Sequence, residues 1–191
     1  MARYLPHFSF SDYYDPDHMG FRALRVINED VVAAGDAFGM HGHQDMEIVT
    51  YVLEGAFVQR RHETAKRFAR QIQRMSAGTG VRHSEFNASP TDPVHLLSDM
   101  CFRESEQPTE LRAEILRGRR ETEPLPHRRL SNGDEGSLKI HQDASIHLAL
   151  VDAGKTVDYP LKAGRHAWRH KCFVATSPST AHPSDKRCRS G

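Results

Sequence analysis

The feature that most constrains this chain is a pair of histidines, two residues apart, in a stretch that reads as a β-strand. His41 and His43 lie in GDAFGMHGHQDMEIVTYVLEG, residues 35–55. Residues two apart on an extended strand point to the same face, so both imidazoles would share one side. His83 and Glu85 repeat this spacing in GVRHSEFN. Two such pairs on facing strands would offer four ligands and leave up to two positions open on an octahedral ion.

The composition fits a folded chain with one sizeable core or two small β domains. Of its 191 residues, 38% are hydrophobic and 27% are charged. The formal net charge of +1 gives no bulk attraction to nucleic acid or to an anionic membrane. No apolar run approaches the roughly 20 residues that span a bilayer, and we see no secretory signal. We therefore expect a cytoplasmic protein that binds neither nucleic acid nor membrane.

The cysteines predict neither a disulfide framework nor a zinc knuckle. Cys101, Cys172 and Cys188 are odd in number, widely spaced and form no C-x2-C pair. The histidines outside the two pairs also lack a partner motif. His95 and His141 lie in apolar runs, and we interpret them as core or edge residues.

Strand patterns occur in patches along the chain. The aromatic-rich residues 4–20 predict a short strand or arm that covers a sheet edge. Other segments with strand character are Ala23–Asp30, the IVTYVL run, Val94–Leu97, Leu138–Asp143, Ile146–Leu150 and Val157–Trp168. By contrast, Val58–Arg74 is strongly basic and shows helical rather than strand periodicity.

The chain resembles the bacterial pirins, a family of bicupins that includes enzymes with quercetin 2,3-dioxygenase activity. The spacings G-x5-H-x-H-x3-E and G-x2-H-x3-N are close to the two cupin motifs. The closer resemblance rests on FSFSDYYDP, HGHQDMEIVTYVLEG and MSAGTGVRHSE. It is nearly continuous over residues 7–57, 73–97 and 135–168. It implies an all-β fold of double-stranded β-helix (jelly-roll) barrels in a bicupin arrangement, with an incomplete second barrel.

This resemblance also suggests how the chain is organised. We predict an N-terminal metal-binding cupin domain over residues 1–97 and an atypical linker over 98–134. A partial C-terminal cupin would follow over 135–168, and residues 169–191 would be a disordered tail.

In the pirins a single metal, usually iron, binds to three histidines and one glutamate. Matched motif to motif, these ligands fall on His41, His43, His83 and Glu85. Fe²⁺ is therefore the expected metal, with Mn, Ni, Co or Cu as alternatives. The general cupin pattern would instead nominate Glu47 as a ligand, whereas the resemblance makes Glu47 a supporting or structural residue. Spacing favours Glu85, because it shares a strand face with His83.

The resemblance implies a metal-dependent dioxygenase that cleaves the heterocycle of a flavonol such as quercetin with O2, releasing CO. Glu85 would also take the substrate proton, which requires it to lie near the substrate oxygen. Two alternatives remain open. One is a non-enzymatic metal-binding regulatory protein that acts through a protein partner. The other is an inactive product of a damaged gene.

Three blocks depart from the resemblance, at about residues 58–72, 98–134 and 169–191. We hypothesise that they are translated out of frame. With a permitted codon choice, Arg169–Pro183 read two bases along gives SQVLRGDVTVNGTS, a strand–turn–strand pattern. The hypothesis predicts that the first barrel lacks a hairpin between its two ligand pairs. It also predicts open sheet edges in the second barrel and poor stability.

Overall fold

The computed structural model describes residues 3–6, 8–9, 13–60, 64–69, 71–102, 110–112, 128–130, 140–149, 151 and 154–172. The chain divides into two compact units, residues 1–150 and 151–191. Most of the predicted linker and residues 173–191 of the predicted tail lie outside the described residues. All the described regular structure is strand and lies in the first unit.

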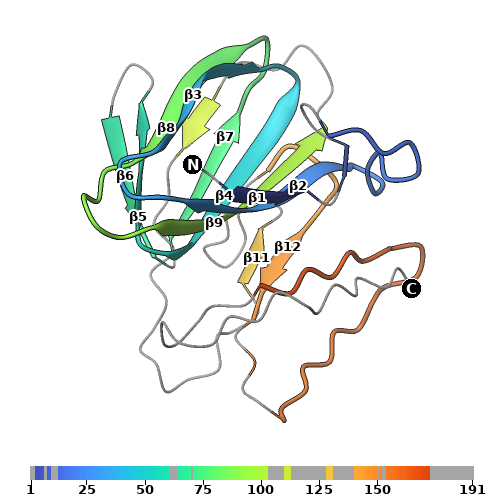
Figure 1. The fold of residues 1–191 in the computed structure, drawn as a ribbon. Helices are drawn as coiled ribbons and strands as arrows, with labels where there is room; N and C mark the ends of the chain where they lie inside the picture. The colour runs from blue at the N-terminus through green and yellow to red at the C-terminus, as the bar shows by residue number, and fades with distance from the viewer. Residues whose placement is uncertain are drawn as a thin grey trace. The chain divides into compact units, whose positions relative to one another are not determined.

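The strands follow one another as β1 (Arg3–Pro6), β2 (Leu24–Val32), β3 (Ala37–His43), β4 (Met46–Glu54), β5 (Ala56–Arg60), β6 (Thr64–Phe68), β7 (Ile72–Ser76), β8 (Val81–Asn87), β9 (Val94–Phe102), β10 (Glu110–Arg112), β11 (Arg128–Leu130) and β12 (Ile146–Leu148). They form a six-stranded sheet in the order β1-β2-β9-β4-β7-β10 and a four-stranded sheet in the order β3-β8-β5-β6 (Figure 1). Strands β11 and β12 form a separate pair. All the pairings are antiparallel.

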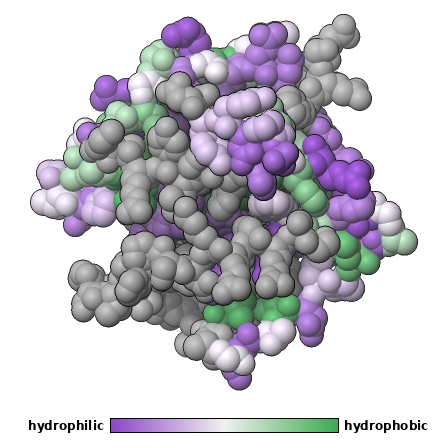
Figure 2. Space-filling model, turned by 45° about the vertical axis from the view of Figure 1, so that its right-hand side comes forward, coloured by the Kyte–Doolittle hydropathy of each residue, from purple (hydrophilic) through white to green (hydrophobic). Residues whose placement is uncertain are grey.

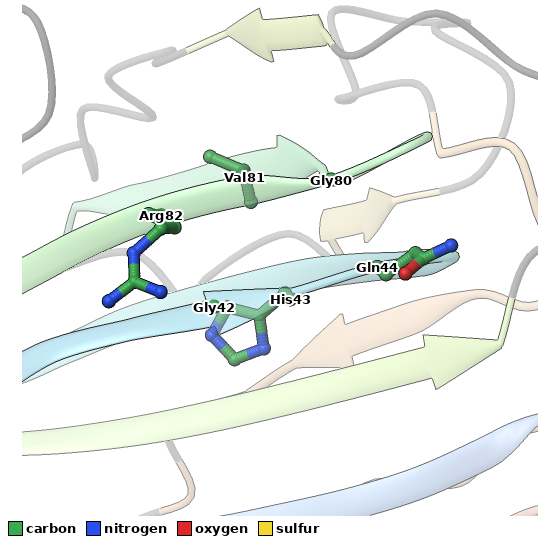
Figure 3. Close-up of a pocket in the computed structure, with 6 residues that line it drawn as sticks. All are labelled: Gly42, His43, Gln44, Gly80, Val81 and Arg82. Atoms are coloured by element: carbon green, nitrogen blue, oxygen red, sulfur yellow. The ribbon is translucent and has the colours of Figure 1, made fainter.

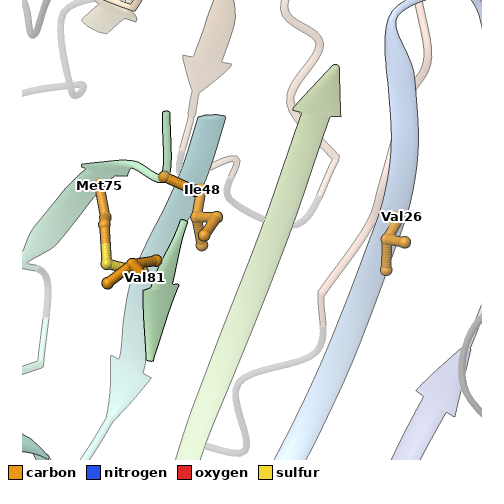
Figure 4. Packing of buried hydrophobic residues seen from close by; sticks show 5 residues of the cluster. Val26, Ile48, Met75 and Val81 are labelled. Atoms are coloured by element: carbon orange, nitrogen blue, oxygen red, sulfur yellow. The ribbon is translucent and has the colours of Figure 1, made fainter. Parts of the chain in front are cut away.

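Two apolar clusters lie between the large sheets and join them into one barrel. The first interior cluster consists of Val26, Ile48, Met75, Ala77 and Val81 (Figure 4). The second interior cluster consists of Val32, Val52, Phe57, Val94 and Leu96. Each cluster takes residues from both sheets, because every second residue of a strand faces inward. The sheets therefore pack face to face around a shared interior.

A third apolar cluster lies on the opposite, outer face of the six-stranded sheet. Val49 of β4 and Ile72 of β7 pack there against Ile140, with Tyr51, Ala144, Ile146 and Leu148 at the margin. This outer cluster covers the second face of the sheet, so β4 and β7 are buried on both faces. Strand β4 accordingly contains the apolar run IVTYVL, whereas β7 also buries the polar residues Gln73, Arg74 and Ser76.

The prediction of helical periodicity over Val58–Arg74 is wrong, and so is the predicted loss of a hairpin from the first barrel. Strands β5 and β6 pair over five residues each, from Ala56↔Phe68 to Arg60↔Thr64. The buried residues Phe57, Val58 and Gln59 occupy both faces of β5, so this strand shows no alternation.

Elsewhere the predicted strands are largely confirmed. Strands β2, β4, β9 and β12 match the expected segments, and β1 pairs with the edge of β2 as a covering arm would. The strands predicted over Leu138–Asp143 and Val157–Trp168 are not confirmed, because the described residues 140–143 and 157–168 contain no strand.

Gly55 forms the tight connection between β4 and β5. Its φ is 83°, a left-handed conformation that favours glycine. A Cβ at this position would lie 2.8 Å from the Pro93 carbonyl oxygen. Any larger residue would therefore push β5 away from the β9 end of the barrel.

Within the described ranges we find no helix long and apolar enough to cross a membrane. Figure 2 shows hydrophilic side chains over much of the described surface on the face that it presents, with hydrophobic side chains in smaller groups.

Candidate metal centre

The structure brings His41, His43 and His83 together inside the barrel. Strands β3 and β8 are neighbours, and His41 pairs directly with His83. The ring centroids are 4.9 Å apart for His41–His43, 4.4 Å for His41–His83 and 5.0 Å for His43–His83. One potential ligand atom from each of the three side chains lies within 4.8 Å of the other two. His83 is almost fully buried, whereas His41 and His43 are partly exposed.

The ring nitrogens are oriented as a metal site requires. His41 Nδ1 lies 2.8 Å from the Gly39 carbonyl oxygen, which leaves Nε2 for a metal. The Nε2 atoms of His43 and His83 are 3.0 Å apart. Two imidazole nitrogens at right angles on one ion, each bound at about 2.1 Å, are separated by about 3.0 Å. The three histidines therefore fit a divalent transition metal.

Glu85 lies beside this group but outside it. Its Oε1 is 3.8 Å from Nδ1 of His83, on the side of the ring away from the other histidines. Because His83 and Glu85 are two residues apart on β8, both face inward, yet one pleat separates their side chains. The role of Glu85 as fourth ligand therefore requires its carboxylate to turn toward the histidines.

Burial controls the charges at this site. Desolvation, with a smaller contribution from Asp30, raises the pKa of Glu85 to about 8. Desolvation, with a smaller contribution from His41, lowers the pKa of His43 to about 4. Without metal at neutral pH, Glu85 is therefore protonated and His43 is neutral. A neutral imidazole is the form that binds a metal, whereas Glu85 must first lose its proton.

We expect metal binding below pH 8 to release about one proton, because Glu85 has to ionise to become a ligand. The apparent metal affinity should accordingly rise with pH and level off above about 8. The stability of the metal-free fold should instead fall as pH rises. The raised pKa favours the protonated form in the folded chain, so this contribution is lost as pH rises from 4.5 through about 8.

Calorimetric titration with Ni²⁺ in two buffers of different ionisation enthalpy measures the released proton. The Glu85→Gln variant, which has no proton to release at this position, is the matched control. Equal proton release from both chains would show that Glu85 is not the titrating ligand.

Glu47 faces away from the histidines. On β4, Glu47, Val49 and Tyr51 point to the outer cluster, whereas Ile48 belongs to the first interior cluster. Glu47 is fully buried, and its carboxylate accepts hydrogen bonds of 2.7 and 2.9 Å from Ser76 Oγ.

A buried arginine completes the environment of Glu47. Nη1 of Arg74 donates to Ser76 Oγ at 2.8 Å and lies 3.7 Å from Glu47 Oε2. The Glu47 carboxylate is thus held in a buried ion pair behind the sheet. This position excludes it as a ligand of the three-histidine group and agrees with the supporting role that the resemblance implies.

A polar layer faces the histidines across the barrel. Asn28, Thr50 and Gln73 are buried and align in one row across the six-stranded sheet, with the backbone of Ser98 between the first two. This row lies between the two interior clusters. The amide oxygens Asn28 Oδ1 and Gln73 Oε1 have no hydrogen-bond partner among the described residues. Such buried acceptors call for a donor from water or a ligand.

Gln59 is a site residue that the sequence analysis missed. Its side chain points inward from β5 and lies 2.5 Å from Nδ1 of His83. Its position in a basic run concealed it. The signal that was available is its spacing of two residues from Phe57 on a strand.

A shallow pocket of about 390 Å³ opens beside His43. The end of β3, the start of β8 and one residue beside each strand line it: Gly42, His43, Gln44, Gly80, Val81 and Arg82 (Figure 3). Arg82 is exposed, as its alternation with His83 on β8 predicts. His95 lies away from this site, and its Nε2 is 2.8 Å from Glu29 Oε1.

Comparison with known proteins identifies relatives that share this fold. Residues 1–98 match the Pirin family, and residues 131–172 match the quercetinase C-terminal cupin domain. Quercetin 2,3-dioxygenase of Escherichia coli K12 is 42% identical over 171 residues, covering 84% of this chain and 70% of that enzyme.

Solved structures give the same result. A crystal structure of the bacterial pirin YhhW of E. coli in complex with nickel(II) matches with a TM-score of 0.70 and 39% identity, covering 76% of this chain. The E. coli protein YhaK matches with a TM-score of 0.65 and 24% identity, covering 85% of this chain and 70% of its own, which shows the fold alone. This chain spans 63% of the nickel-bound pirin.

The antiparallel barrel with histidines gathered inside it is a cupin fold. The sequence identity and the family match then determine the family within this class of proteins. The chain belongs to the pirin family.

Proposed function

We propose that this protein is a metal-dependent dioxygenase that cleaves a flavonol such as quercetin with O2. The observation that carries the proposal is the three-histidine group, in which the Nε2 atoms of His43 and His83 have the spacing of two ligands on one ion. The E. coli relative named quercetin 2,3-dioxygenase supports the substrate class. Fe²⁺ is the metal that we propose, while the nickel(II) complex of the related pirin supports a divalent transition metal more generally.

His41, His43, His83 and Glu85 would hold the metal. His41 is fixed by the Gly39 carbonyl, and His83 is fixed by Gln59. When bound, the metal supplies an electron-transferring Lewis-acid centre between the flavonol and O2. Once it has ionised, the Glu85 carboxylate would also accept a hydroxyl proton from the substrate.

The polar layer supports a substrate that is rich in hydroxyl groups. Asn28 and Gln73 each present a buried amide oxygen that lacks a donor among the described residues. A polyhydroxylated aromatic ring bound in the barrel would supply such donors, and the apolar clusters would contact its faces. Hydrogen bonds to buried acceptors are a strong source of discrimination, because a ligand without donors leaves them unpaired.

The test is aerobic incubation of the metal-loaded chain with quercetin while O2 uptake, CO release and quercetin loss are measured together. The proposal predicts that the three occur in equal amounts and stop in the His41→Ala variant. Tight metal binding with no turnover of any flavonol would instead favour a metal-binding regulatory protein that acts through a protein partner. An insoluble chain that binds no metal would favour the product of a damaged gene.

A further inference from the structure

Both ring nitrogens of His83 lie within hydrogen-bond distance of another side chain. Because a neutral imidazole carries one proton, the contact at one nitrogen limits the contact that the other can make. Nε2 lies 3.0 Å from Nε2 of His43, within the candidate metal group. Nδ1 lies 2.5 Å from the side-chain amide of Gln59, whereas Glu85 Oε1 is further away at 3.8 Å. The amide is therefore the group that sets the orientation of this ring.

The contact between Gln59 and His83 lies inside the barrel. Their side chains are 3% and 1% exposed, so water competes little for the hydrogen bond. They come from neighbouring strands, because β5 pairs with β8 and Gln59 lies opposite Glu85. His83 is the diagonal neighbour of Gln59, a relation within reach of long side chains. The Gln59 amide also contacts Met75 Sδ at 4.0 Å.

The chemistry of a carboxamide explains why glutamine suits this position. A metal on Nε2 requires the proton of His83 to sit on Nδ1, which then needs an acceptor. Without metal, a proton on Nε2 donates to His43, and Nδ1 needs a donor instead. A side-chain amide carries both an acceptor oxygen and a donor NH2 group. A half-turn about the Cγ–Cδ bond of glutamine exchanges their positions. A carboxylate or a thioether could serve only one of the two forms.

We propose that Gln59 is a positioning residue of the metal centre, whose buried amide directs His83 Nε2 toward the metal and turns with the tautomer of that ring. The proposal rests on the proposed function only in that His83 binds a metal. It does not depend on the substrate or on turnover.

The test compares the Zn²⁺ affinity of Gln59→Leu, Gln59→Glu and Asn87→Leu with that of the unmodified chain, by competition with a chromophoric chelator. Asn87→Leu is the control, because it also replaces a buried amide of the barrel by leucine. The Asn87 amide donates to the carbonyl oxygens of Val32, Ala33 and Asp92 and to no histidine. Loss of the Gln59 amide should weaken Zn²⁺ binding about 10- to 100-fold. Gln59→Glu keeps an acceptor for the Nδ1 proton and should bind Zn²⁺ at least as tightly as the unmodified chain.

The proposal is overturned if Gln59→Leu and the control have equal affinity, or if Gln59→Glu weakens binding as much as Gln59→Leu. A second readout, ¹⁵N NMR of His83 in the unmodified chain, covers the case in which the leucine variant does not fold. The proton should move from Nε2 to Nδ1 when Zn²⁺ is added, and a proton that stays on one nitrogen would contradict the amide half-turn. Failure of flavonol turnover alone leaves all these results unchanged.

Discussion

His83→Ala should remove both metal binding and the proposed flavonol turnover. His83 lies opposite His41 and within 3.0 Å of His43, so its loss breaks two of the three pairwise contacts in the group. We expect a larger loss of metal affinity than the roughly 10- to 100-fold that follows removal of an outer partner of a ligand. The measurement is metal content after dialysis, followed by quercetin turnover on the same sample.

The matched control for this prediction is His95→Ala. His95 is also a strand histidine of the first unit, but it pairs with Glu29 at 2.8 Å and lies outside the candidate metal group. The control should retain metal and turnover while it loses some stability. If His83→Ala keeps a full equivalent of metal, the assignment of the histidines is wrong.

Glu47→Ala should destabilise the fold by about 3–5 kcal/mol, because it leaves the guanidinium of Arg74 buried without its carboxylate. Both side chains are at most 2% exposed, so water cannot replace the missing charge. The free energy of unfolding in urea measures this effect. The double variant Glu47→Met with Arg74→Met should recover much of the loss, since a buried ion pair replaced by apolar residues of similar size is often neutral or stabilising.

The same position also tests the general cupin pattern. Glu47→Gln keeps acceptor capacity for Ser76 and removes only the charge, so its fold should be the less disturbed of the single variants. Its metal stoichiometry and affinity should equal those of the unmodified chain. A loss of metal from a folded Glu47→Gln protein would make Glu47 a ligand after all and would contradict the orientation of β4.

The histidine group was predictable because strand geometry has a fixed period. His41 and His43 share one strand, as do His83 and Glu85, so each pair is placed on one face by sequence alone. Glu47 was not predictable in the same way. The turn at Gln44 and Asp45 separates Glu47 from the histidines. Alternation along a strand does not continue through a turn, so the face on which Glu47 lies cannot be counted from His43.

The misinterpreted segment, Val58–Arg74, has a physical explanation. Arg74 is buried because it pairs with Glu47 across two strands, a contact that local periodicity cannot reveal. Gln59 is buried because it contacts His83, which is equally remote in sequence. In both cases a polar residue is buried at a position where the alternating pattern of a strand predicts an apolar residue. The raised pKa of Glu85 is caused mainly by burial inside the barrel, with a smaller contribution from Asp30 of another strand, and local sequence reveals neither.

The frame hypothesis for residues 58–72, 98–134 and 169–191 stays a prediction, although its structural consequence in the first block is wrong. The β5–β6 hairpin forms with the residues that are present. Sequencing the coding DNA and translating it in three frames tests the remainder. Single-base insertions or deletions beside the three blocks would support the hypothesis, and an uninterrupted frame in close relatives that share these residues would refute it.

The central claim is that one metal binds between His41, His43, His83 and Glu85. Anomalous diffraction from crystals of the Ni²⁺- or Fe²⁺-loaded protein tests it directly. We predict one peak inside the barrel, about 2.0–2.2 Å from Nε2 of each histidine and from a carboxylate oxygen of Glu85. A peak beside Glu47, or metal bound only outside the barrel, would contradict the account.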